Sequence, residues 1–254
     1  MNEAGKKLHM GTSGWSYKDW RGVFYPQGQK SVDYLSFYAQ KMDSVEIDST
    51  FYGIPRASTV ENWFKVTPDH FLFCPKAPQQ ITHKKRLQNC GEEWRIFLDR
   101  MRLLKHKLGP VVMQFEYKFK FAEYFETLES FLREAEFGET KLCIEVRDKN
   151  WYQPAAFDLL RQHNVALVLS DLYYMPRISE ITADFTYIRL LGNRHRIPDD
   201  FSRVRLNRDK DFDFWSEKIN GFLDKNLEVY VYSNNRYQGH APSTIDSLKK
   251  RIPI

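Results

Sequence analysis

Short apolar runs of strand length recur along the chain and alternate with segments that carry a helical pattern. Eight such runs are present, at residues 8–11, 44–47, 71–76, 111–115, 141–146, 166–169, 185–190 and 227–232. The runs at 111–115 and 166–169 are continuous rather than alternating, as in parallel strands that are buried on both faces. Eight βα units favour closure into a (β/α)8 TIM-type barrel, with an open doubly wound sheet as the alternative.

The segments between these runs predict helices that pack one face on the sheet. Two such faces consist of Val32, Leu35, Ala39 and Met42, and of Trp94, Phe97, Leu98, Met101 and Leu104. Ser58 and Glu61 have the spacing of a capping box, and Pro154 suits the first turn of a helix. Residues 172–184 carry no helical pattern, so one βα unit is predicted to be degenerate.

Length and composition suit one α/β domain. The chain has 254 residues, 42% of them hydrophobic, and no Pro/Gly/Ser-rich linker divides it, so a single domain over residues 1–254 is expected. It contains no apolar run of about 18 residues, and residues 1–7 are too polar for the apolar region of a signal peptide, which predicts no membrane span and no signal peptide. Three widely spaced cysteines indicate reduced packing residues and a cytoplasmic location.

Polar side chains end nearly every predicted strand, at the face where TIM barrels carry their active sites. Three of them are the candidate catalytic groups, namely Glu46, Glu145 and Asp171. The candidate ligand-binding residues at these ends and in the loops beside them are Trp15, Asp48, Tyr52, Lys76, His83, Gln114, Arg147, Trp151, Arg189, Asn234 and Asn235.

The spacing within two of these strand ends indicates acid–base chemistry. Residues two apart on a strand point to the same side, so Glu46 with Asp48, and Glu145 with Arg147, can face the barrel mouth together. Carboxylates and a cation held in this way shift one another's pKa values and can act as acid and base. The alternative is an ion-pair network that only fills the barrel.

Three cations at strand ends predict an anionic ligand. Lys76, Arg147 and Arg189 would form a seat for a phosphate or carboxylate group. The net charge of +5 permits such a partner without requiring one.

No cofactor is predicted, because the chain lacks a GxGxxG, P-loop or GxSxG motif. A divalent metal held by Glu46, Glu145 and Asp171, with His83 or His240, is a weaker alternative without a supporting motif.

Two basic loops and several aromatic residues suggest nucleic acid as another partner. The loops are His83-Lys84-Lys85-Arg86 and Arg194-His195-Arg196. Stacking platforms beside them could be Trp15, Tyr17, Trp20, Tyr52, Trp151 and Tyr173. Solvated surface and core packing are the alternatives for both sets.

A series of short motifs, in order over nearly the whole chain, resembles the family called domain of unknown function 72, or YecE-like. The motifs are Gly11-Thr12-Ser13-Gly14-Trp15, Phe24-Tyr25-Pro26, Val45-Glu46-Ile47-Asp48-Ser49-Thr50-Phe51-Tyr52, Lys76-Ala77-Pro78, Ile81-Thr82-His83, Lys107-Leu108-Gly109-Pro110, Glu145-Val146-Arg147, Asn150-Trp151, Asp171, Tyr187-Ile188-Arg189 and Tyr232-Ser233-Asn234-Asn235. The resemblance implies a barrel related to the xylose isomerase and apurinic-site endonuclease group, and a family without an established reaction.

The chain departs from that family's pattern at several positions. Asp148 and Leu191 stand where histidines are common, Phe115-Glu116 replaces a Pro-Pro pair, and Asp48 stands where asparagine is frequent. The missing histidines argue against a zinc site of the endonuclease kind.

The sequence thus leaves three functions open. The first is a hydrolase, lyase or isomerase acting on a phosphate-bearing or sugar-like ligand. The second is a nucleic-acid-binding protein that uses the basic, aromatic rim. The third is a non-catalytic sensor or partner-binding barrel.

Overall fold

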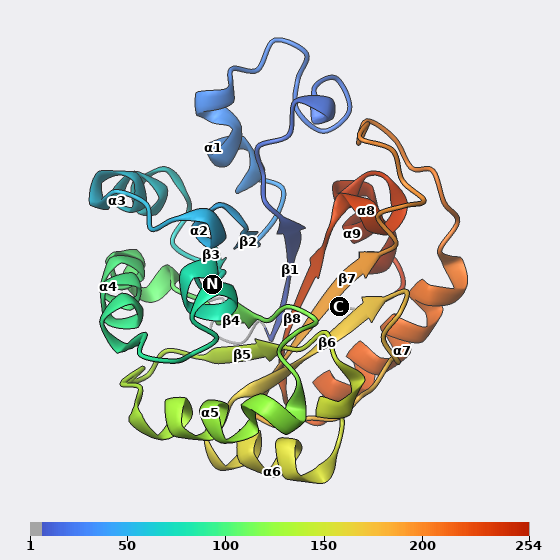
Figure 1. Ribbon diagram of the computed structural model, residues 1–254. Helices are drawn as coiled ribbons and strands as arrows, with labels where there is room; N and C mark the ends of the chain where they lie inside the picture. Colours follow the sequence, from blue (N-terminus) through green and yellow to red (C-terminus); the bar gives the residue numbers. More distant parts are fainter. Residues whose placement is uncertain (1–6, 254) are drawn as a thin grey trace. The chain divides into compact units, whose positions relative to one another are not determined.

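The computed structural model of the chain describes residues 7–253 and contains a β-strand at each of the eight predicted places (Figure 1). The strands are β1 (Leu8–Ser13), β2 (Ser44–Ile47), β3 (Leu72–Pro75), β4 (Val111–Gln114), β5 (Leu142–Glu145), β6 (Ala166–Leu172), β7 (Phe185–Gly192) and β8 (Glu228–Ser233). Their side chains are almost all buried on both faces, which explains why the apolar runs are continuous. The strand predictions are confirmed.

The strands follow the order β3-β2-β1-β8-β7-β6-β5-β4. The two strands at the ends of this order are themselves bridged, in parallel, by Phe73 with Leu108 and by Lys76 with Val112. This bridging replaces the free edges of an open sheet, so the predicted (β/α)8 barrel class is confirmed and the doubly wound alternative is wrong.

Helices occupy most of the connections between strands. The longer ones are α3 (Ala57–Val66), α4 (Gly91–Met101), α5 (Phe121–Glu134), α6 (Pro154–Gln162), α7 (Asp209–Asp224) and α9 (Ala241–Lys249). Short ones are α1 (Tyr34–Tyr38), α2 (Ser49–Tyr52), α8 (Asn235–Gln238), the π-helix η3 (Gln80–Lys84), and the 3-10 helices η1 (Lys18–Trp20), η2 (Ser31–Asp33), η4 (Arg102–Lys107) and η5 (Lys149–Trp151).

Two details of the helix predictions are wrong. Val32 lies in η2 with 81% of its surface exposed, so it does not belong to the buried face that Leu35 and Ala39 share. Ser58 does not cap α3, because that helix begins after Arg56 and no side chain caps it. Pro154 begins α6, as predicted.

The connection between β6 and β7 is the degenerate one. No helix forms there among the described residues. Hydrogen bonds of Thr182 hold part of the segment in place instead. The Thr182 hydroxyl accepts a hydrogen bond from Leu167 N at 2.8 Å and donates one to Val165 O at 2.7 Å. The Thr182 side chain thus satisfies two backbone groups near the start of β6.

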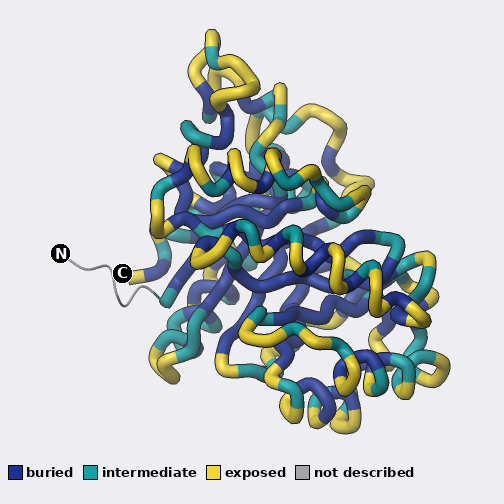
Figure 2. Tube along the Cα trace, turned by 90° about the vertical axis from the view of Figure 1, so that its left-hand side faces the viewer, coloured by how far each residue is buried: buried dark blue, intermediate teal, exposed yellow. Residues whose placement is uncertain are grey.

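The chain forms two compact units. Unit 1 comprises residues 1–45, 169–179 and 184–254, and holds β1, β7, β8 and α7 to α9; unit 2 comprises residues 46–168 and 180–183, and holds β3 to β5 and α2 to α6. The strands of both units are buried, and exposed positions recur along the helices. Figure 2 shows the distribution of buried and exposed positions along the chain. The single-domain assignment stays a prediction.

Close strand packing in unit 1 requires one glycine. A Cβ atom at Gly11 of β1 would lie 2.0 Å from the carbonyl oxygen of Ser44. Any other residue at this position would push β2 away from β1.

Two further sequence expectations concern the cysteines and the membrane. Cys74, Cys90 and Cys143 are buried and form no disulfide. Among the described residues, no helix is both long and apolar enough to cross a bilayer.

His240 gives the fold a pH dependence. It is buried at the N-cap of α9, where Nδ1 accepts a hydrogen bond from Ser243 N at 3.3 Å, and burial lowers the pKa of His240 to about 4. The unfolded chain therefore takes up this proton first as the pH falls below about 6.5. We expect the free energy of unfolding to drop by about 3 kcal/mol between pH 7 and pH 4.

In His240→Asn the cap acceptor is retained and the titration is removed. Urea unfolding across this pH range checks the prediction. An equally steep pH dependence in the wild type and in His240→Asn would contradict it.

Candidate functional site

The carboxyl ends of β2, β3, β4 and β5 are neighbours within unit 2. Lys76 N donates to Ile47 O at 3.2 Å, Ala77 N donates to Val112 O at 2.9 Å, and Gln114 pairs in register with Glu145. These contacts bring together the polar residues that follow the four strands. We call Glu46, Asp48, Lys76, His83, Glu145 and Arg147 the unit 2 cluster.

Lys76 carries a buried ammonium group in this cluster. The residue is 8% exposed, and its Nζ lies 3.3 Å from Asp48 Oδ1 and 4.7 Å from the centre of the Phe51 ring. The Asp48 side chain is 31% exposed. The ion pair is thus reached by water on the side of Asp48.

Glu145 and Arg147 form an ion pair at the end of β5. Glu145 is fully buried, while the Arg147 side chain is 15% exposed. The contact confirms that these two side chains, two residues apart, share one side of the chain. Burial, and then the charge of Glu145, raise the pKa of the nearby Tyr152, so its phenol stays protonated.

His83 lies on η3 and is the titratable imidazole of the cluster. The Thr82 hydroxyl lies 2.9 Å from its Nδ1, and its ring meets the Phe51 ring edge-on at 4.9 Å. Burial lowers the pKa of His83, and so do the charges of Lys76, Arg147 and Arg86, against an opposing effect of Glu116. The imidazole is therefore neutral at pH 7 and can accept a proton.

The other predicted residues of unit 2 differ in exposure. Glu46 is fully buried at the end of β2, Tyr52 is 76% exposed on α2, and the Gln114 side-chain amide donates to Phe115 O at 2.7 Å. Trp151 is 2% exposed, stacks on Phe119 at 5.2 Å and donates from Nε1 to Phe119 O at 2.7 Å. Trp151 therefore packs in the core, whereas the Tyr52 side chain is exposed to water.

One contact beside the cluster was missed by the sequence analysis. Arg86, which the basic loop had suggested as a free rim charge, donates from Nε and Nη2 to Glu116 Oε1 at 3.0 and 2.6 Å. Glu116 follows β4, 30 positions after Arg86 in the sequence, so no local pattern pairs the two residues. The segment that ends this loop is also unusual, because Arg86, Leu87 and Asn89 all have positive φ.

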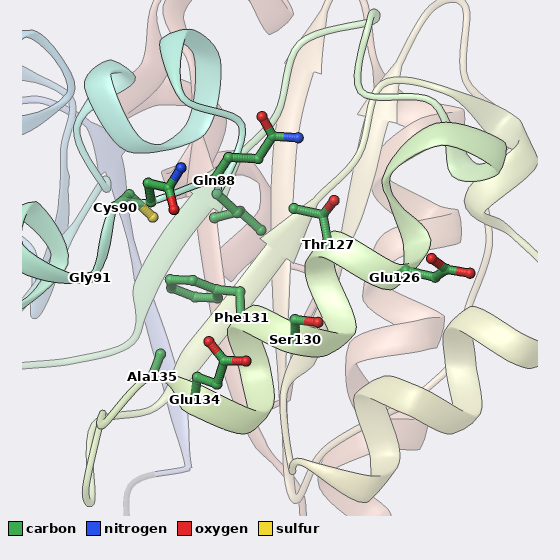
Figure 3. A pocket seen from close by; sticks show the side chains of 11 residues that line it. Gln88, Cys90, Gly91, Glu126, Thr127, Ser130, Phe131, Glu134 and Ala135 are labelled. Atoms are coloured by element: carbon green, nitrogen blue, oxygen red, sulfur yellow. The ribbon is translucent and has the colours of Figure 1, made fainter.

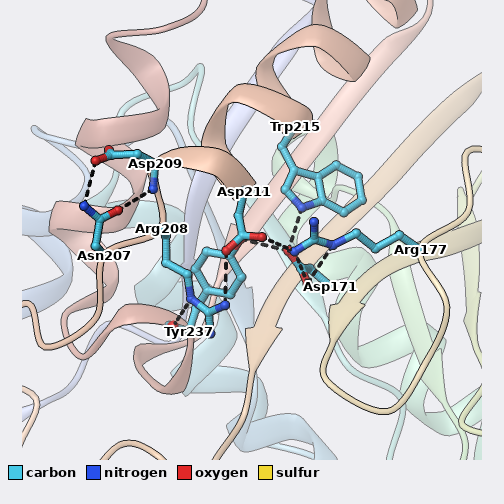
Figure 4. A network of polar contacts seen from close by, with 8 residues as sticks. All are labelled: Asp171, Arg177, Asn207, Arg208, Asp209, Asp211, Trp215 and Tyr237. Carbon is cyan, nitrogen blue, oxygen red and sulfur yellow. Dashed lines mark hydrogen bonds and ion pairs between the residues drawn. The ribbon is translucent and has the colours of Figure 1, made fainter.

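Asp171, the third predicted catalytic carboxylate, lies in unit 1 at the centre of a separate network (Figure 4). Arg177 donates to both of its oxygens, and Trp215 Nε1 and Tyr237 Oη each donate to Oδ2 at 2.8 Å. Burial, and then Asp171 itself, raise the pKa of Tyr237, so its phenol remains a donor. With these donors in place, Asp171 is held as an acceptor that anchors its surroundings.

Arg177 continues this network to the start of α7. It also pairs with Asp211, to which Arg208 Nη1 donates at 3.1 Å. Burial opposes ionisation of Asp211, but the hydrogen bonds from Arg177 and Arg208 outweigh it and hold its pKa below the ordinary value. The network therefore joins the end of β6 to α7 and α8.

The remaining predicted residues also belong to unit 1. Asn235 Oδ1 accepts from Trp20 Nε1 at 3.2 Å and from Ala241 N at 2.9 Å, and Asn234 caps α8. Arg189 is 2% exposed on β7, and Trp15 is half-buried. The two asparagines thus position backbone and core groups.

A groove in unit 2 lies apart from the unit 2 cluster, between residues 87–91 and α5 (Figure 3). Its volume is about 530 Å³, and Phe131 and Cys90 form its apolar part. Burial raises the pKa of Cys90 to about 11, so its thiol is protonated. The residues lining this groove include no member of the unit 2 cluster, so groove and cluster are separate features.

No group of three or more histidine, cysteine, aspartate or glutamate side chains within residues 7–253 is arranged to hold a metal ion. The metal alternative gains no support from this geometry.

Comparison with known proteins gives one family. The family model described as "Protein of unknown function DUF72" matches residues 9–254. UPF0759 protein YecE of Escherichia coli K12 is 30% identical over 107 residues, and YunF of Bacillus subtilis is 28% identical over 159 residues. These matches cover 42% and 59% of this chain but only 37% and 54% of the relatives, so the chain spans about half the length of the curated relatives or less.

Solved structures of this family share the fold. A DUF72 family protein from Thermotoga maritima superposes with a TM-score of 0.80 at 26% identity, covering 96% of this chain and 98% of that one. A DUF72 family protein from Enterococcus faecalis superposes with a TM-score of 0.75 at 22% identity, covering 96% of both chains. The second likeness concerns the fold alone.

The Asp171 network predicts a large stability effect. Asp171→Asn removes the charge that Arg177 neutralises and turns one acceptor oxygen into a donor facing other donors. We expect it to lower the free energy of unfolding by roughly 2–4 kcal/mol. Asp213→Asn, on α7 with a 72% exposed side chain, should cost less than about 1 kcal/mol. Chemical unfolding of both variants checks this; similar small losses would contradict it.

Proposed function

This chain belongs to the DUF72 family, whose description names no activity, and we propose that its unit 2 cluster binds a small phosphate- or carboxylate-bearing ligand and can transfer a proton to or from it. The observation that carries the proposal is a pair of cations, the buried Lys76 after β3 and the half-buried Arg147 after β5, two strands that both lie beside β4. Lys76 pairs with Asp48, and Arg147 pairs with Glu145. Both cations also act electrostatically on the same imidazole, that of His83.

The ion pairs give the ligand a route into the cluster. An anion that reaches Arg147 competes with Glu145 for the guanidinium, whose fork suits phosphate and carboxylate groups equally. As the Glu145–Arg147 pair weakens, the proton affinity of Glu145 rises, because a nearby cation favours the ionised form of a carboxylate. The ligand thereby activates its own base. A carboxylate base of this kind serves in many hydrolase, lyase and isomerase reactions.

Asp171 has a different part in this proposal. Its oxygens are occupied by Arg177, Trp215 and Tyr237, so we assign it to positioning and leave proton transfer to Glu145 and Glu46. We also propose a cytoplasmic location, which the three buried, unbridged cysteines support.

Sulfate is a suitable probe for the anion seat because its charge is constant from pH 5 to 8. We expect Lys76→Met and Arg147→Met each to weaken sulfate binding by about tenfold. Lys65→Met, at an exposed position of α3, is the matched control and should bind as the wild type does. Isothermal titration calorimetry with thermal melting of each variant separates lost binding from lost folding. Unchanged binding in both cluster variants would overturn the proposal.

His83 predicts how this binding depends on pH. Its pKa lies below the ordinary value, so the charged fraction of the imidazole is small at pH 7 and increases as the pH falls. That charge adds a third cation beside Lys76 and Arg147, whereas Arg86 is occupied by Glu116. We expect sulfate affinity to rise from pH 7 to pH 5 in the wild type and to stay nearly level in His83→Gln. Parallel pH profiles of the two proteins would show that His83 does not face the anion.

A further inference from the structure

We propose that unit 1 carries a binding surface for single-stranded nucleic acid, formed by two turns that follow β6 and β7. This aromatic–basic surface consists of Tyr173, Tyr174, Arg194, His195 and Arg196. It lies outside the unit 2 cluster and does not depend on the function proposed for that cluster. The two strands are neighbours in the sheet, so their carboxyl ends deliver both turns to the same side of unit 1 (Figure 1).

The first turn holds two tyrosine rings out in water. Tyr173 is 57% exposed and Tyr174 47%, and their rings meet edge-on at 5.0 Å. Two adjacent exposed rings form a small apolar patch, and contiguous exposed patches of this kind occur at sites that bind partners. Every base has a π face, and exposed tyrosines are the usual platforms on which unpaired bases stack.

This turn is anchored at both ends, so the exposure of the rings is built into the structure. Leu172 and Met175 on either side are buried, and Met175 N donates to Leu172 O at 3.0 Å. Two residues further on, Arg177 binds Asp171 and Asp211 (Figure 4). A platform that is already ordered loses little conformational entropy when a base stacks on it.

The second turn supplies cations beside these rings. Arg194, His195 and Arg196 are all exposed. The turn is held by His195 N, which donates to Asn193 Oδ1 at 2.9 Å, and by the buried Ile197. Tyr173 N donates to Gly192 O at 3.4 Å, and the Tyr173 and His195 rings lie 6.5 Å apart, so the two turns touch.

Acidic groups close to the second turn are neutralised by other arginines. Asp199 pairs with Arg236 and Asp200 with Arg205. Among residues 7–253, no carboxylate forms an ion pair with Arg194 or Arg196. Their guanidinium groups are therefore available for phosphates.

The charge of the whole unit agrees with this partner. Unit 1 contains 20 lysines and arginines against 15 aspartates and glutamates, whereas unit 2 contains 18 of each. The net charge of +5 is thus carried by unit 1. A positive field favours encounter with a polyanion, and the exposed tyrosines favour one that has unpaired bases.

The test is fluorescence anisotropy with labelled 15-nucleotide oligo-dT and oligo-U and with a DNA duplex of equal length. We expect both single strands to bind the full chain more tightly than the duplex does. If two or three phosphates are neutralised, Kd should rise by about 7- to 20-fold between about 50 and 200 mM salt. Absence of binding at low salt, or tighter binding of the duplex, would overturn the proposal.

Two double variants separate stacking from charge. Tyr173→Ala/Tyr174→Ala should weaken binding by about fivefold or more and leave the salt slope unchanged. Arg194→Ala/Arg196→Ala should weaken binding and lower the slope of log affinity against log salt by about 1.4. The four side chains are exposed, so both variants should melt as the wild type does.

The matched control is Arg95→Ala/Tyr117→Ala in unit 2, where the Arg95 side chain is 67% and Tyr117 is 62% exposed. It should bind as the wild type does. An equal loss in this control would show that binding follows overall charge and would overturn the proposal. Binding that depends on the arginines but not on the tyrosines would indicate a site for polyanions without bases, and this too would overturn it.

Discussion

A charged group that is taken out of water must be paired, and this constraint decides the arrangement at the strand ends of both units. Parallel strands pack closely at their carboxyl ends. Four charged residues are buried there, namely Lys76, Glu145, Asp171 and Arg189. An unpaired charge at such a place costs several kcal/mol, so each of the first three lies against a partner of opposite sign. The number and kind of the other partners then determine what each group can do.

Asp171 and Glu145 illustrate this difference. Asp171 receives donors from a guanidinium, an indole and a phenol, so it has little capacity left for a ligand and serves to fix three segments of unit 1. Glu145 is tied to Arg147, whose side chain water still reaches. Two carboxylates at equivalent strand ends therefore have different parts, one in positioning and one in the proposed chemistry.

The way in which the charged groups are held also explains why the two proposals concern different surfaces. In unit 2 the proposed anion seat is largely buried, and an anion that reaches Arg147 has to compete with Glu145 for the guanidinium. In unit 1 the Arg177 network fixes a turn whose tyrosines stay in water. The first arrangement suits a small ligand that replaces a carboxylate, and the second suits an extended partner that is bound without rearrangement.

The local pattern of the sequence determined the fold class and the location of the candidate groups. Continuous apolar runs indicate the strands because both faces of these strands are buried. The missing helical pattern at 172–184 indicates the degenerate βα unit. Each of these signals is carried by residues that are neighbours in the sequence. The pairing of Glu145 with Arg147 was predictable for the same reason, since two positions on one strand suffice.

Only the tertiary structure decided the partners that come from elsewhere in the chain. Trp215 and Tyr237 lie 44 and 66 positions beyond Asp171, and Glu116 lies 30 positions beyond Arg86. Likewise, the exposure of Val32 and the burial of Trp151 depend on what packs against them. No local pattern records those contacts, because they arise from how strands and helices pack rather than from the order of residues within them.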